Sequence, residues 1–238
     1  MKRRRFQKLK RLVKVVLRKD IMPPIQYKCH TQRFGSLFCG WRISPDNLYQ
    51  NSTIYSFGVG QDVSFDTELI KHFGVTIHAF DPTPKSIEWI KKQPLPHQFI
   101  MHEYGICDVD GRIQFNPPLD PKNVSHTILK RPQTQDHAIT VPVMRLSTIM
   151  EKLDHREIDL IKMDIEGAEY RVISDIAKTN VRPKQLLIEF HHRFPGVGIT
   201  QTKKTLIKLY EMHYRLFSVS DSGEEYGFIN IGNNDRSY

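Results

Sequence analysis

The sequence predicts an α/β fold in which crossover helices connect the strands of a mostly parallel sheet. From about Thr53 onward, short apolar segments of strand character alternate with segments whose apolar residues recur at helical spacing. A glycine-containing turn, FGVGQD, follows the first strand, and Asp81 ends the second. Both features are typical of open sheets that bind a nucleoside outside the carboxyl ends of their strands.

The first half of this alternating region begins with the strand TIYSF (53–57). A helix follows, because its apolar residues share one face and Gly74 is a stop signal. The next elements in order are a strand at 75–80, a short helix at 86–92 and a strand at 97–105. Residues 111–131 are rich in Pro, Asn and Asp, and predict a hairpin and a long loop of the kind that often covers a ligand.

The second half centres on IDLIKMD (158–164), which is apolar enough to form a strand buried on both faces. A strand and a helix between 141 and 155 precede it. After it come a helix at 168–178, a strand at 184–192, a helix at 202–213, and two strands at 214–220 and 226–231. That final pair, joined by a polar turn, would close the sheet with an antiparallel edge.

The positive charge of the chain is confined to its N-terminus. Residues 1–20 contain ten Lys or Arg and one acid, which accounts for the whole formal net charge of +9 of the 238 residues. The neutral remainder lacks the basic track that a nucleic-acid-binding cleft needs, so we expect no nucleic-acid partner. We divide the chain into this basic tail (1–20), an irregular lead-in (21–52) and one domain (53–238).

The basic tail has two readings. Phe6, Leu9, Val13 and Val16 would form one apolar stripe on a helix, which could lie on an anionic membrane surface; the alternative is a solvated basic extension. The tail lacks the run of ~18 continuous apolar residues that is needed to span a bilayer. It also lacks the uninterrupted apolar core and the small-residue cleavage site of a secretory signal. The three cysteines have no CxxC spacing, so neither a disulfide framework nor a zinc site is indicated. We expect a cytoplasmic protein, with peripheral contact at the inner face of the membrane as one role of the tail.

The turn after the first strand carries Gly58 and Gly60, which would let the backbone approach a cofactor closely. Asp81 follows Gly60 by about the 20 positions expected for an acid that binds ribose hydroxyls. Asp62 has a simpler reading as a cap of the following helix. Val63 stands where the third glycine of a dinucleotide fingerprint would fall, and no P-loop motif occurs. A nucleoside without a pyrophosphate therefore fits best.

Carboxylates gather where the strand 158–164 ends. Asp164 is expected at the carboxyl end of a central strand, where ligands bind. Gly167 allows a tight turn, and Glu169 falls in the first turn of the next helix, where its charge would complement the helix dipole.

Five segments in order, FGVGQD, HAFDPTP, YGICDVDG, IDLIKMDIEGAE and LLIEFHHRF, resemble the FkbM family of S-adenosylmethionine-dependent methyltransferases. The resemblance covers roughly Thr53 to Ile231, and KMDIEGAE is its most specific part. It implies a class I methyltransferase fold, a Rossmann-like seven-stranded, mostly parallel sheet with an antiparallel last strand. It also implies which residues face the cofactor: Gly58 and Gly60 the methionine part, Asp81 the ribose, and the loop from Gly105 to Asp108 the adenine edge. Many members carry an aspartate two positions before the first glycine and a further glycine after the turn, where this chain has Ser56 and Asp62. Asp62 and Asp164 complete our candidate cofactor-binding residues.

The acceptor side of the site is predicted from the neighbouring strand ends. The side chains expected to converge on one cleft mouth are those of Asp164, Glu166, Glu189, His191 and His192. His191 is the first candidate for the base that takes a hydroxyl proton, because its unperturbed pKa lies near neutrality; hydrogen bonding at a strand end is the alternative. Clustered acids with a histidine could also bind a divalent metal. The spacing of a dedicated HExxH-type site is absent, so no metal ligand is assigned.

These features predict a methyltransferase that uses S-adenosylmethionine, with O-methylation of a small hydroxylated acceptor, such as a glycan sugar or a secondary metabolite, as the expected reaction. The resemblance alone supplies the acceptor class. Two other classes stay open: a catalytically inactive methyltransferase-like binding module, and a nicotinamide-dependent oxidoreductase that uses the same crevice. A nucleic-acid methyltransferase is disfavoured, since no motif for holding a flipped base follows the strand 158–164.

Overall fold

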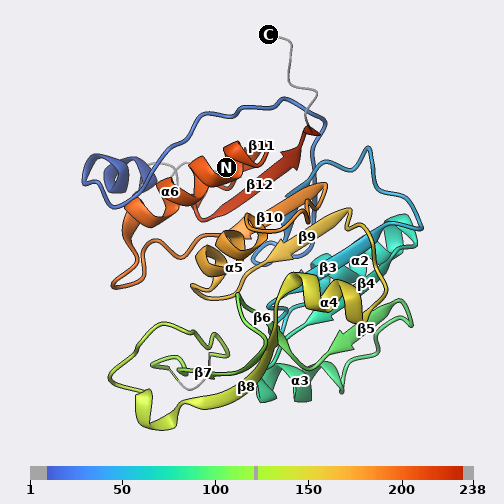
Figure 1. The fold of residues 1–238 in the computed structure, drawn as a ribbon, viewed down its shortest axis with the longest axis horizontal. Helices are drawn as coiled ribbons and strands as arrows, with labels where there is room; N and C mark the ends of the chain where they lie inside the picture. Colours follow the sequence, from blue (N-terminus) through green and yellow to red (C-terminus); the bar gives the residue numbers. More distant parts are fainter. Residues whose placement is uncertain (1–9, 121–122, 233–238) are drawn as a thin grey trace.

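The computed structural model in Figure 1 describes residues 10–120 and 123–232. A seven-stranded sheet runs through its centre in the order β11-β12-β10-β9-β3-β4-β5. Its strands are β3 Thr53–Phe57, β4 Thr76–Phe80, β5 Phe99–His102, β9 Leu160–Met163, β10 Gln185–Glu189, β11 Tyr214–Val219 and β12 Glu225–Asn230. β12 runs antiparallel to both of its neighbours, and the other neighbouring strands run parallel. The predicted fold class is therefore confirmed.

The final pair of strands closes one end of the sheet with an antiparallel edge, as predicted, and β12 lies on the inner side of this pair. After β10, helix α6 (Gly198–Glu211) leads to β11, which forms the edge of the sheet and is separated from β10 by one strand position. The chain then turns back, and β12 fills the position between β10 and β11. The backbone N–H groups of Gln26 and Tyr27 donate to the carbonyl of Leu216 in β11, so the N-terminal segment covers part of this edge.

Two apolar cores lie on the two faces of the sheet. On one face, buried side chains of α4 (Leu146–Lys152), α5 (Glu169–Ile176) and α6 pack together with those of the strands. On the other face, α2 (Ser64–Phe73) and α3 (Pro84–Ile90) contribute to the second core. β9 supplies both cores because its side chains alternate between the faces, and all four of its residues are buried. The prediction of a central, doubly buried strand is confirmed.

The segment between β5 and α4 forms a second, smaller sheet below the main one in the view of Figure 1. Its strands are β6 Gly105–Ile106, β7 Gly111–Phe115 and β8 Ile139–Met144, in the order β6-β8-β7. A short 3-10 helix, Gln135–His137, precedes β8. The hairpin predicted within residues 111–131 is therefore wrong: the described part of that range contains β7 and an isolated bridge between Asn116 and Thr127, and β7 pairs with the distant β8.

Residues 21–52, expected to be irregular, contain an antiparallel pair, β1 Gln32–Phe34 and β2 Trp41–Ile43. Trp41 and Ile43 are buried in the second core, and the Ser44 backbone exchanges two hydrogen bonds with the Gln185 side chain. This segment therefore packs as part of the domain surface. Residues 10–16 are helical with Val13 and Val16 exposed, while Phe6 and Leu9 of the predicted stripe lie outside the described residues. No helix in the described ranges is long and apolar enough to cross a membrane.

Candidate functional site

The turn after β3 is built for close approach of two backbones. Gly58 has a φ of 72°, and a Cβ at this position would lie 1.7 Å from the carbonyl oxygen of Asp164. Only glycine fits there. The ammonium group of Lys162 in β9 donates to the carbonyls of Phe57 and Gly58, at 3.3 and 2.5 Å, and holds the turn against the neighbouring strand end.

Asp81 follows β4 and organises the same turn. Its Oδ2 accepts a hydrogen bond from the backbone N–H of Gly60 at 2.9 Å. Its Oδ1 accepts from the backbone N–H and the hydroxyl of Thr83, at 2.9 and 2.6 Å. A carboxylate offers about four lone-pair positions, so Asp81 retains capacity for a ligand hydroxyl.

A pocket of about 610 Å³, including its open mouth, lies at the carboxyl ends of β3, β4 and β9. Gly58, Gly60, Asp81 and Asp164 all line it, although they come from three separate strand ends. Its apolar walls include the side chains of Phe80, Ile106 and Phe115. The structure thus brings four of the six predicted cofactor-binding residues around one cavity.

The other two predicted cofactor residues lie outside this pocket's lining. Asp62 accepts a hydrogen bond from the backbone N–H of Ser64, the first residue of α2, and another from the hydroxyl of Ser36. The N-cap position of α2 is Val63, so the expectation that Asp62 is the N-cap is wrong, although Asp62 does bind the first backbone N–H of the helix. Asp108 forms an ion pair of 2.6 Å with Arg171 on α5, so its carboxylate is turned toward that helix. Burial alone would raise the pKa of Asp108, but the hydrogen bond from Arg171 lowers it below the usual range.

An acid–histidine cluster adjoins the pocket mouth. His191 directly follows Phe190 at the end of β10, and its Nε2 lies 3.7 Å from Asp164 Oδ1 and 3.6 Å from Glu166 Oε2. Its Nδ1 lies 2.6 Å from Glu169 Oε1. Burial alone would lower the pKa of His191, but these three carboxylates raise it to about 10. The carboxylates thus favour the protonated imidazole, which must lose its proton before it can act as the predicted base or bind a ligand through Nε2.

Glu169 is the member of this cluster that sequence reasoning missed. It was expected to complement the dipole of α5, and it is indeed the first residue of that helix. Its side chain is also fully buried, accepts a hydrogen bond from the backbone N–H of Gly167 and contacts His191. The proximity of Glu169 to a histidine 22 positions later is a tertiary feature that spacing along the chain does not reveal.

The inserted segment between β7 and β8 covers the turn that carries these acids. Thr127 is buried, and its hydroxyl donates to the carbonyl of Glu166. A Cβ on Gly167 would lie 2.8 Å from Leu129 of the same segment. Ser125 and His126 line the pocket. The prediction that this loop covers a ligand site therefore has a structural basis in its contacts.

Glu189 lies at the end of β10, beside Glu225 of β12. It lines an open groove together with Arg33, Trp41 and Tyr226, and it is absent from the lining of the first pocket. Burial, and then the nearby Asp164 carboxylate, raise the pKa of Glu189 well above its usual range. The structure thus separates Glu189 from the cofactor-side pocket, while Asp164 lies close enough to affect it electrostatically.

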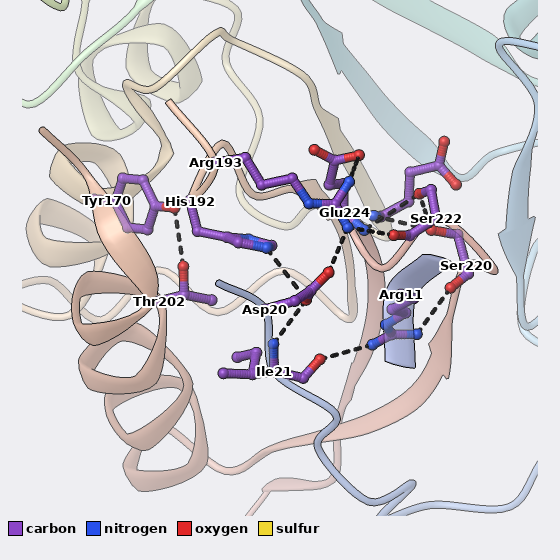
Figure 2. Close-up of polar contacts among 11 residues, drawn as sticks. Arg11, Asp20, Ile21, Tyr170, His192, Arg193, Thr202, Ser220, Ser222 and Glu224 are labelled. Atoms are coloured by element: carbon purple, nitrogen blue, oxygen red, sulfur yellow. Dashed lines mark hydrogen bonds and ion pairs between the residues drawn. The ribbon is translucent and has the colours of Figure 1, made fainter. Parts of the chain in front are cut away.

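The loop after β10 is tied to the N-terminal segment, as Figure 2 shows. Asp20 is 2% exposed, and its carboxylate lies 3.3 Å from His192 Nε2 and forms an ion pair with Arg193. Arg11 donates to the carbonyls of Ser220 and Ile21, at 3.1 and 3.0 Å. His192 therefore faces the N-terminal segment, whereas His191 faces the pocket mouth.

Residues 42–228 match the family model described as the methyltransferase FkbM domain. The chain is 23% identical over 184 residues to the probable methyltransferase-like protein 24 of Rattus norvegicus, a match that covers 76% of this chain and 42% of that protein. It is 24% identical over 159 residues to the protein of the same name from Homo sapiens, covering 66% and 37%. The chain therefore spans less than half the length of these curated relatives.

Two solved structures illustrate the structural neighbours. The methyltransferase FkbM of Methylobacillus flagellatus KT is 14% identical, with 77% of this chain and 44% of that chain covered and a TM-score of 0.48. The fibrillarin of Aeropyrum pernix, in complex with natively bound S-adenosyl-L-methionine, is 9% identical, with 86% and 84% covered and a TM-score of 0.44.

Proposed function

Because the chain belongs to the FkbM methyltransferase family, whose model matches residues 42–228, we propose that it transfers a methyl group from S-adenosylmethionine to a hydroxyl oxygen of a small acceptor. The observation that carries this proposal is the common pocket lined by Gly58, Asp81 and Asp164. Family membership supports a methyltransferase. The hydroxyl acceptor and the roles of the individual residues are our inference from the side chains around the pocket.

The residues around the pocket fit S-adenosylmethionine. Asp81 Oδ2 accepts only one hydrogen bond within the protein and can accept another from a ribose hydroxyl, and the buried Phe80 and Ile106 offer an apolar wall to the adenine ring. The open space beside Gly60, where a Cβ would meet only Val124 at 3.7 Å, allows the cofactor to pass close to the backbone. Asp164 and Glu166 favour a positively charged group at the pocket mouth, as a sulfonium would be.

The bound cofactor supplies a methyl group on a sulfonium sulfur, which leaves as a neutral thioether when an acceptor oxygen takes the methyl carbon. The protein's part is to place the acceptor hydroxyl in line with the carbon–sulfur bond and to take its proton. We assign the proton to Asp164. The Asp164 side chain is 31% exposed although its Oδ1 is buried, so Oδ2 is the oxygen available to the hydroxyl. The products are a methyl ether, a thioether and a protonated carboxyl group.

The acceptor is proposed to enter from the groove that holds Glu189. Carboxylates of Glu189 and Glu225 and the guanidinium of Arg33 can accept and donate hydrogen bonds to hydroxyl groups there, and Trp41 and Tyr226 contribute aromatic surface. This mixture suits a hydroxylated molecule such as a sugar or a secondary metabolite. Glu189 in this groove is close enough to Asp164 for the Asp164 carboxylate to raise its pKa.

Calorimetric titration of the purified chain with S-adenosylmethionine tests the cofactor assignment. Asp81→Ala should weaken binding by about tenfold to a hundredfold, because hydrogen bonds to a charged group contribute about 1.5–3 kcal/mol. Glu157→Gln, a change of a highly exposed acid, is the matched control and should bind as the unaltered chain does. Unchanged affinity in Asp81→Ala would refute the assignment. Tighter binding of NADH would favour an oxidoreductase, and cofactor binding without turnover on any hydroxylated acceptor would favour an inactive binding module.

A further inference from the structure

The acid–histidine cluster has the composition and spacing of a metal site. Asp164, Glu166 and His191 each offer one ligand atom, and these atoms lie within 4.8 Å of one another. His191 Nε2 is 3.7 Å from the Asp164 oxygen and 3.6 Å from the Glu166 oxygen. Two ligands that each lie about 2.1 Å from one ion cannot be more than about 4.2 Å apart. Both distances from the imidazole meet this condition, and the Asp164 and Glu166 oxygens, which lie within 4.8 Å of each other, need to approach by at most about 0.6 Å.

One buried polar atom of the cluster, Asp164 Oδ1, has no hydrogen-bond partner among the described residues. The His191 side chain is only 7% exposed, and both distances from its Nε2 are too long for hydrogen bonds. A buried carboxylate oxygen such as Asp164 Oδ1 normally has a partner. An ion bound between the three side chains would provide a partner for Asp164 Oδ1.

Glu169 supplies a second and independent indication. Its fully buried carboxylate lies 2.6 Å from His191 Nδ1 and is itself held by the backbone N–H of Gly167 at 3.0 Å. When Nδ1 donates to this carboxylate, the lone pair of a neutral imidazole lies on Nε2, which faces Asp164 and Glu166. Histidines that bind metals usually have such a carboxylate partner on their other nitrogen, which fixes the tautomer and the ring orientation.

We propose that Asp164, Glu166 and His191 bind one divalent cation at the mouth of the cofactor pocket, with Glu169 as the positioning residue of His191. Two carboxylates and one imidazole suit Mn²⁺ best, with Mg²⁺ and Zn²⁺ as competitors. The remaining coordination positions are open to water or to the oxygen of an acceptor hydroxyl. The role of the ion in binding the acceptor rests on the proposed function. The ion would hold the acceptor oxygen in place beside the methyl group.

The test is a titration of the full chain with MnCl₂, after removal of metals by a chelator, followed by electron paramagnetic resonance of free Mn²⁺. The unaltered chain should bind one Mn²⁺ with micromolar affinity. Asp164→Asn and Glu166→Gln, which keep the side-chain shape, should weaken binding at least tenfold, and Glu169→Gln by about tenfold to a hundredfold. Glu157→Gln should leave it unchanged, and thermal unfolding of each variant checks that it is folded.

The outcomes separate this inference from the proposed function. Binding weaker than millimolar in the unaltered chain, or equal binding in Asp164→Asn and the control, overturns the metal site. Calorimetry with S-adenosylmethionine in the absence of Mn²⁺ then reports on the cofactor independently. Cofactor binding without a Mn²⁺ site leaves the proposed function standing and ends the metal proposal. A Mn²⁺ site without cofactor binding overturns the proposed function and leaves the metal site standing.

Discussion

Two glycines of the same turn should respond differently to the same substitution. Gly58 and Gly60 have φ angles of 72° and 56°, so alanine is strained at both by about 1 kcal/mol. At Gly60 the added Cβ meets only Val124 Cγ2, at 3.7 Å, which is ordinary contact. At Gly58 it would lie 1.7 Å from the carbonyl oxygen of Asp164, a backbone atom that cannot rotate away. The end of β3 or the end of β9 must then move.

The expected loss of unfolding free energy follows from these distances. Gly60→Ala should lose about 1 kcal/mol, the strain alone. Gly58→Ala should lose about 2–4 kcal/mol, since displacement of packed backbone adds about 1–3 kcal/mol. Urea unfolding followed by circular dichroism measures both values against the unaltered chain. Equal losses in the two variants would refute the close approach of the β3 turn to Asp164.

Two further predictions concern charged groups. Asp20→Ala should lower the unfolding free energy by about 2–3 kcal/mol, because it leaves Arg193 and His192 without their buried partner; a change in urea unfolding no larger than that of Glu157→Gln would contradict this. Burial, and then His155 and His102, lower the pKa of His78 to about 4. This folded-state pKa lies below the unfolded value of 6.5, so stability is complete above pH 6.5 and is lost as pH falls toward 4; at most about 2 kcal/mol disappears between pH 7 and 5. His78→Gln should remove this part of the pH dependence of the unfolding free energy. The same pH dependence in His78→Gln and the unaltered chain would contradict the prediction.

The main sheet could be predicted because its information is local. Each central strand is an apolar run bounded by turn residues, and β9 shows this most clearly, with four buried residues in LIKM. The small sheets lack such a signal. β1 and β2 are only three residues long, with the mixed compositions QRF and WRI, and their stability depends on packing against the domain.

The cofactor side of the candidate site was more accessible to sequence reasoning than the acceptor side. Gly58, Gly60 and Asp81 follow strands that the sequence identifies, and backbone topology alone brings them together. Asp108 was expected along the same edge, but its direction is set by Arg171 on a helix that spacing cannot relate to it. The burial of Glu169 likewise depends on His191, which belongs to another strand end.

The N-terminal segment shows the same limit for charge patterns. A run of basic residues with one acid was read as a solvated or membrane-bound tail. Asp20 is instead buried against Arg193, 173 positions away, and Arg11 reaches the turn before β12. Net charge describes the segment as a whole, whereas burial depends on individual partners that the folded domain supplies.

A crystal structure of the chain with S-adenosylhomocysteine, the demethylated form of the cofactor, would test the central assignment most directly. The ribose hydroxyls should lie within hydrogen-bonding distance of Asp81, and the sulfur should lie between the turn at Gly58 and the carboxylate of Asp164. A ligand found in the groove beside Glu189 and Trp41 instead, with the pocket at the β3 and β4 ends unused, would contradict the account.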